Sequence, residues 1–113
     1  MPPFSGQINF YNGSAETVAP GVTRQILGYL SSLMLVKVTF DKDSVGEPHQ
    51  HPHDQVTYIM RGSFEVEING HKEVLNQGDS FVVPGGTKHG VVCLASGILL
   101  DAFSPMRDEF IAK

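Results

Sequence analysis

The chain has 113 residues, enough for one domain with one modest hydrophobic core. Hydrophobic residues make up 41% and charged residues 18%, and 12 acidic against 8 basic residues give a net charge of −4. This acidic balance argues against binding to nucleic acid or an anionic membrane, and no apolar run approaches the roughly 20 residues that span a bilayer.

Residues 1–21 contain several prolines and glycines and one short apolar patch at Ile8, Phe10 and Tyr11. We expect an arm that becomes ordered by pairing with another sheet edge, which a partner subunit can supply. With the exposed edges of a short barrel, this arm predicts a homodimer. The first residues lack the basic and apolar regions of a signal peptide, so we expect a cytoplasmic protein.

From Val22 onward the sequence predicts strands. The segments are short, rich in β-branched or aromatic residues and separated by turn residues, and they cover 26–30, 33–40, 56–60, 64–68, 74–75, 81–83, 91–94 and 98–103. This spacing predicts an all-β sandwich or barrel in which residues 22–113 form a single domain. Asn69-Gly70, after the alternating strand Phe64–Ile68, predicts a two-residue hairpin turn.

Three histidines at 49, 51 and 53 precede the strand predicted over 56–60. Residues two apart in an extended chain point to the same side, so His49 and His51 can direct two imidazoles at one point. Gln55 has the same parity and can bring an amide oxygen to the same cavity. Such ligands predict a metal site, with a solvated histidine-rich loop as the simpler alternative. His53 follows Pro52, and we expect it beside the site or facing solvent.

A second stretch, Gly78–His89, predicts two turns around a strand at 80–83, with His89 opening the next apolar run. Cys93 shares parity with His89, which points it towards the cavity, and is interpreted as a small buried residue; as the sole cysteine it cannot form an internal disulfide. His71 lies beside the predicted hairpin turn and is expected on the surface.

The C-terminal stretch holds two candidate site residues. Asp101 interrupts the apolar segment 98–103, and it faces either water or, with Leu99 and Phe103, the interior, where it could act as an acid or base. Arg107 follows a Ser-Pro turn. It either folds over the barrel mouth to bind a substrate carboxylate or pairs with an adjacent acidic residue in a short terminal helix.

The two central stretches resemble the two cupin motifs. The residues that match are His49, His51 and position 55 before a strand ending in Gly62, followed by Gly78, Pro84, Gly86 and His89. The resemblance implies a jelly-roll β-barrel in which His49, His51, Gln55 and His89 hold one divalent metal ion. The chain departs from the motifs at Gln55, where Glu is usual, and at Cys93, where Asn often stands. The first departure lowers the negative charge of the site.

Further stretches at 21–27, 49–55 and 99–110 are similar to the pectin-degradation cupins of KdgF type. That resemblance implies ring opening of 4,5-unsaturated uronate monosaccharides from pectin or alginate, yielding the linear 5-keto form. Asp101, Phe103 and Arg107 would then be the reaction and substrate residues, and a small anionic sugar the partner.

The sequence is also compatible with two other classes of function, a metal-dependent cupin dioxygenase and a non-catalytic sugar-binding cupin. Histidine and amide ligands accept nickel, zinc, iron, manganese or cobalt, so they do not identify the metal.

Overall fold

The computed structural model describes residues 13–111, which form eight strands and one short 3-10 helix. The elements are β1 (Glu16–Ala19), β2 (Val22–Leu30), β3 (Leu33–Phe40), β4 (Val45–His49), β5 (Asp54–Ile68), β6 (His71–Asn76), β7 (Ser80–Val83), β8 (His89–Ser104) and η1 (Asp108–Phe110). The all-β prediction is confirmed, and η1 follows Arg107, where a short terminal helix was one of the two alternatives.

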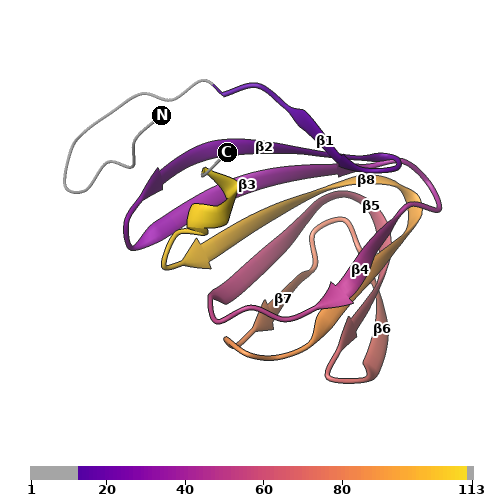
Figure 1. The fold of residues 1–113 in the computed structure, drawn as a ribbon. Coiled ribbons are helices and arrows are strands. Elements are labelled where there is room, and N and C mark those ends of the chain that lie inside the picture. Colours follow the sequence, from indigo (N-terminus) through magenta and orange to yellow (C-terminus); the bar gives the residue numbers. More distant parts are fainter. Residues whose placement is uncertain (1–12, 112–113) are drawn as a thin grey trace.

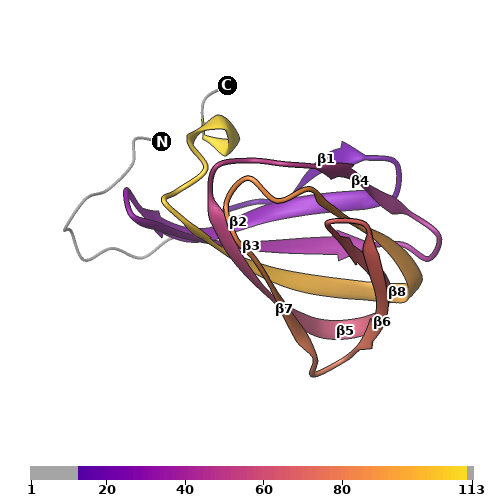
Figure 2. The same ribbon diagram turned by 90° about the horizontal axis from the view of Figure 1, so that it is seen from below.

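All eight strands belong to one curled antiparallel sheet (Figures 1 and 2). The main order is β1-β2-β3-β8-β5-β6, while β4 pairs with β8 and β7 pairs with β5. The two longest strands thus each contribute to both halves of a jelly-roll barrel: β8 pairs with β3 and β4, and β5 with β6 and β7. The barrel is a single domain, as predicted.

The sequence predicted breaks between 60 and 64 and between 94 and 98, but β5 and β8 both continue through these positions. The pairing shifts register between Ile59 and Phe64, so turn-like residues here mark an irregular kink in the strand instead of its end. Gly62 has a φ of 83°, and a Cβ on it would lie 2.6 Å from Ser96 O. Glycine is therefore required where the two strands cross closely.

The predicted hairpin at Asn69-Gly70 is confirmed. Ile68 pairs with His71, and the two turn residues have φ values of 51° and 83°. Both are positive, as a type I′ turn requires.

Inward-facing residues form the barrel core in two clusters. The larger one includes Phe40 and Phe64, whose rings meet edge to face at 5.2 Å, together with Cys93. The smaller one contains Met34, Val36 and Phe103, near the end of β8 beside which η1 folds (Figure 1). Cys93 is fully buried, so its interpretation as a small buried residue is confirmed. It packs in the core and is not part of the cavity wall described below.

Two strands were not predicted, β1 and β4. Glu16–Ala19 pairs with β2 of the same chain. The apolar patch at 8–11 lies outside the described residues, so the prediction of an arm at 1–21 that contacts a partner stays a prediction. Within residues 13–111 no helix has the length and apolar character needed to cross a membrane.

Candidate metal centre

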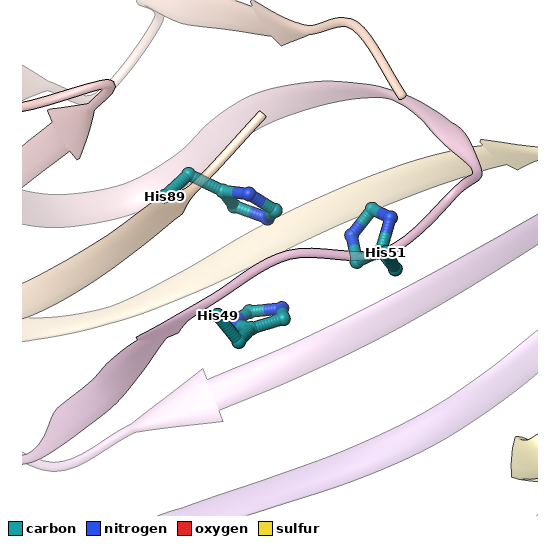
Figure 3. Close-up of side chains that lie close together, drawn as sticks. All are labelled: His49, His51 and His89. Atoms are coloured by element: carbon teal, nitrogen blue, oxygen red, sulfur yellow. The ribbon is translucent and has the colours of Figure 1, made fainter. Parts of the chain in front are cut away.

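Three histidine rings from separate segments turn towards one space inside the barrel (Figure 3). His49 ends β4, His51 lies in the loop that follows, and His89 begins β8. The ring centroids are 4.5 Å apart for His49 and His89 and 4.9 Å apart for His51 and His89. One ring nitrogen of each residue lies within 4.8 Å of the other two, so the three can share one ion.

Main-chain carbonyls fix the orientation of all three rings. The Nδ1–H groups donate to carbonyl oxygens two residues away: His49 to Glu47 O at 2.9 Å, His51 to His53 O at 3.1 Å, and His89 to Thr87 O at 2.9 Å. Because Nδ1 carries the proton, Nε2 presents a lone pair. This is the usual arrangement of a metal-binding histidine.

Burial keeps the inner rings neutral. It lowers the pKa of His89 to about 4, and it lowers the pKa of His51 as well, with the positive charge of Arg107 as a second cause. Both rings are therefore unprotonated at neutral pH, which is the form that binds a metal ion.

Gln55 directs its amide oxygen at the same centre. Its Oε1 lies 3.1 Å from Nε2 of both His51 and His89, while its Nε2 donates to Thr57 Oγ1 at 2.8 Å. Two ring lone pairs and an amide oxygen thus face one another with no proton between them. A cation placed among them would relieve this repulsion. The residues fit a divalent metal ion, which three imidazoles and one amide oxygen would hold.

The two sequence motifs meet at two glycines of the second motif, Gly85 and Gly86. Gly86 N donates to His51 O at 2.7 Å, and Gly85 N donates to the Asp54 carboxylate at 2.8 Å. A Cβ on Gly85 would lie 3.0 Å from the carbonyl carbon of Pro52. The glycines of the second motif therefore let its turn approach the loop that carries His51.

Asp101 faces the interior, which decides between the two alternatives left by the sequence. It is 8% exposed and accepts a hydrogen bond of 2.6 Å from Thr57 Oγ1 and a longer one of 3.4 Å from Gln55 Nε2. Burial raises the pKa of Asp101 to about 6, although Thr57 and Arg107 both act to lower it. A carboxyl group that titrates near neutral pH can both accept and return a proton.

Arg107 pairs with an adjacent acidic residue, which was one of its two alternatives, and it also lies on the cavity wall. Its Nε and Nη2 donate to Glu109 Oε2 at 3.0 and 2.9 Å, and its guanidinium also lines the cavity. The Arg107 Cζ lies 5.0 Å from the centre of the Phe103 ring, which meets the ring of His51 edge to face at 5.7 Å. Phe103 thus connects the arginine to the histidine centre.

A cavity of about 340 Å³ brings most of the predicted site residues together. Its wall includes His49, Gln55, His89, Asp101, Phe103 and Arg107. Sequence reasoning missed Arg24 and Phe110, which also line it, and Thr57, which binds Asp101. Strand parity could have found two of them, because residues two apart in a strand face the same side. Arg24 is two residues from the buried Val22, and Thr57 is two residues from Gln55. Nothing in the sequence pointed to Phe110.

The other two histidines lie outside the ligand set. His53 is buried beside the site and contributes its carbonyl to His51, whereas His71 is exposed and pairs with Glu73. A ring nitrogen of His53 also lies within 4.8 Å of the carboxylates of Asp108 and Glu109. Arg107 already supplies a positive charge to Glu109, which disfavours a second cation there.

Residues 36–101 match the cupin domain family. The pectin degradation protein KdgF of Dickeya dadantii (strain 3937) is 43% identical over 98 residues, which cover 85% of this chain and 89% of that protein. An RmlC-like cupin structure from Shewanella frigidimarina is 43% identical with a TM-score of 0.87, covering 92% of this chain and 96% of that one. The structure of KdgF from Halomonas sp. is 42% identical with a TM-score of 0.87, covering 92% and 99%. The chain thus belongs to the cupin family, and KdgF proteins are among its relatives.

Proposed function

We propose that this protein acts in pectin degradation as a metal-dependent enzyme that opens the ring of 4,5-unsaturated uronate monosaccharides. The observation that carries the proposal is the position of Gln55, whose oxygen faces His51 and His89 and whose nitrogen lies 3.4 Å from the Asp101 carboxylate. One side chain thereby joins a metal-ligand set to a buried acid. The 43% identity to a protein named for pectin degradation supports the substrate class.

The proposed reaction is an isomerisation. The substrate is a cyclic hemiacetal whose ring oxygen, O5, is also an enol ether oxygen. Loss of the anomeric hydroxyl proton while the C1–O5 bond breaks gives an aldehyde at C1 and an enolate at C5, and protonation of C4 gives the linear 5-keto product. A bound divalent cation would supply Lewis-acid stabilisation of the negative charge that develops on O5.

Three residues of the cavity act on the substrate in this proposal. Asp101 moves a proton, either from the anomeric hydroxyl or to C4, and its pKa of about 6 suits either direction. Arg107 holds the C6 carboxylate through its donors that do not bind Glu109, and Phe103 packs against the sugar ring. The neutral ligand set leaves the full charge of a divalent cation in place, which favours an anionic ligand.

The test is to incubate metal-loaded protein with the unsaturated uronate and follow the absorbance of its conjugated double bond, with and without chelator. The proposal predicts metal-dependent loss of absorbance and a product of unchanged mass. Oxygen uptake with a gain in mass would instead indicate a dioxygenase. Equal absorbance traces with wild type, Asp101→Ala and no protein would indicate a sugar-binding protein without activity.

A homodimer and a cytoplasmic location stay predictions. The outer face of the sheet offers an apolar surface for a second copy, because Leu35, Val56, Tyr58 and Val82 are each between 41% and 61% exposed there. Val56 pairs with Val82, and Val56 and Leu35 both pair with Ala102, so these residues are neighbours. Light scattering of the purified protein would give the mass of the assembly.

A further inference from the structure

Arg24 of β2 is a second guanidinium on the wall of the cavity. Its Cζ lies 3.8 Å from the centre of the Phe110 ring, and the Cζ of Arg107 lies 4.2 Å from the same point. Two guanidinium groups cannot occupy the same space above one ring face. Arg24 and Arg107 therefore stack against Phe110 side by side or from opposite faces, and the cavity has two separate positive groups.

Arg24 is held in place but keeps unused hydrogen-bond donors. Its Nη2 donates to Glu16 Oε1 at 2.9 Å, which anchors the guanidinium from the β1 side. Its Nε is buried without a hydrogen-bond partner, and within residues 13–111 the guanidinium makes no hydrogen bond besides the one to Glu16. The side chain is 20% exposed although Nε is buried, so the donors that a ligand can use are those of the two terminal nitrogens, Nη1 and Nη2.

The sheet places Arg24 away from the proposed reaction centre. Arg24 pairs with Val38 on β3, and Val38 pairs with Leu99 on β8, the strand that carries Asp101. Adjacent strands are about 4.8 Å apart, so Arg24 stands two strand spacings from β8. A sugar with its carboxylate at the metal centre and Arg107 would direct its hydroxyl groups across this distance.

We propose that Arg24 is a second ligand-binding residue of the cavity, which donates hydrogen bonds to vicinal hydroxyl groups of an anionic sugar. A planar guanidinium with two parallel N–H bonds matches a pair of adjacent oxygen atoms. The inference rests on the proposed function in one respect, that the carboxylate of the sugar binds at the metal centre.

The experiment compares two ligands by titration calorimetry on metal-loaded protein. Galacturonate carries a carboxylate and a sugar ring, whereas glycolate carries a carboxylate and one hydroxyl group and is too short to reach Arg24. Replacing Arg24 by Gln should weaken galacturonate binding about tenfold or more, since it removes hydrogen bonds from a charged donor. Glycolate affinity should change by less than about twofold, because its contacts are unaltered.

Glu16→Gln is the matched control, because it removes the ion pair of Arg24 but keeps both the guanidinium and an oxygen acceptor. It should leave both affinities within about twofold of wild type. If Arg24→Gln weakens both ligands alike, or weakens neither, the inference is overturned. It is overturned too if Glu16→Gln has the same effect as Arg24→Gln, since Arg24 then acts only by holding β1 to β2.

Arg24→Lys covers the case in which the Gln variant does not fold. Lysine keeps the charge but lacks the planar fork, so galacturonate should bind more weakly than to wild type, with glycolate unchanged. Equal binding of galacturonate to wild type and Arg24→Lys would contradict the inference. No turnover is needed in these titrations. A protein that binds galacturonate through Arg24 but leaves the unsaturated uronate unchanged would count against the proposed function and not against the role of Arg24.

Discussion

Thr57 donates a hydrogen bond to Asp101 inside the cavity, with 2.6 Å between the two oxygen atoms. This bond acts to lower the pKa of Asp101, against the larger effect of burial. Thr57 in turn accepts a hydrogen bond from Gln55, so the hydroxyl group links the proposed metal ligand to the proposed acid.

Thr57→Val should therefore raise the pKa of Asp101 further at almost constant side-chain volume. The limb of the pH–rate profile that reports Asp101 should move to higher pH, which lowers kcat/KM at neutral pH if Asp101 accepts the proton and raises it if Asp101 donates. The measurement is kcat/KM against pH, with bound metal quantified in both proteins. An unshifted profile at equal metal content would show that Thr57 does not tune Asp101.

Asp101→Asn should stabilise the metal-free protein at neutral pH. The folded-state pKa of Asp101 is about 6 and the ordinary value 3.8, so the folded state binds this proton more tightly. The protonated Asp101 contributes fully to the free energy of unfolding below about pH 4. This contribution is lost as the pH rises through 6, and the free energy of unfolding is then lower by on the order of 3 kcal/mol. Chemical denaturation at pH 4 and pH 7 should show a gain only at pH 7. Asp108→Asn, at an exposed position, should show no such difference.

Gln55→Glu should raise the affinity for the metal ion and lower the turnover. A carboxylate adds negative charge to the ligand set, so metal binding should tighten about tenfold or more. The same charge would stand beside Asp101, now 3.4 Å from Gln55 Nε2, and would oppose an anionic substrate. Turnover should fall at least about tenfold. Competition with a coloured chelator gives the metal affinity, and full activity in the variant would argue against a role for the neutral ligand.

Removing the metal should abolish turnover and lower the melting temperature. An ion present at 100 times its Kd stabilises the folded state by about 2.7 kcal/mol, and adding it back should restore both properties. His51→Ala should lose this response. His71→Ala is the control, because His71 is exposed at the β5–β6 turn and should leave metal content unchanged. Loss of metal in both variants would contradict the assigned ligands.

Gly62→Ala should destabilise the barrel by several kcal/mol, on the order of 3, since it adds strain at positive φ to a clash with the chain at Ser96. Gly70→Ala separates the two causes. Gly70 has the same φ of 83°, but a Cβ there would meet nothing within 4 Å. Its cost should be about 1 kcal/mol. Denaturant midpoints of the two variants measure the difference, and equal losses would mean that the clash is absorbed elsewhere.

Local patterns predicted the parts of the fold and site that depend on near neighbours in the chain. Alternation placed Phe64 and Val66 inward, as their burial confirms, and Asn69-Gly70 gave the hairpin. The parity of His49, His51 and Gln55 likewise brought three side chains towards one point.

Contacts between distant segments could not be read in this way. Arg24 and Phe110 are 86 residues apart, and their stacking depends on how η1 folds back over the barrel. The continuity of β8 across 95–97 depends on pairing with β5 around Gly62, and a turn-rich segment does not reveal its partner. Asp101 remained ambiguous for the same reason, since strand parity alone does not say which face is covered.

The carbonyls that orient His49, His51 and His89 belong to the peptide backbone at Glu47, His53 and Thr87. Exchanging the side chain at any of these three positions leaves the acceptor oxygen in place. Substitutions at these three positions should thus leave the orientation of the histidine rings unchanged. A lineage built on this scaffold could acquire new substrates through changes on the cavity wall, such as those of Arg24 or Arg107, while the ion-binding framework is inherited intact.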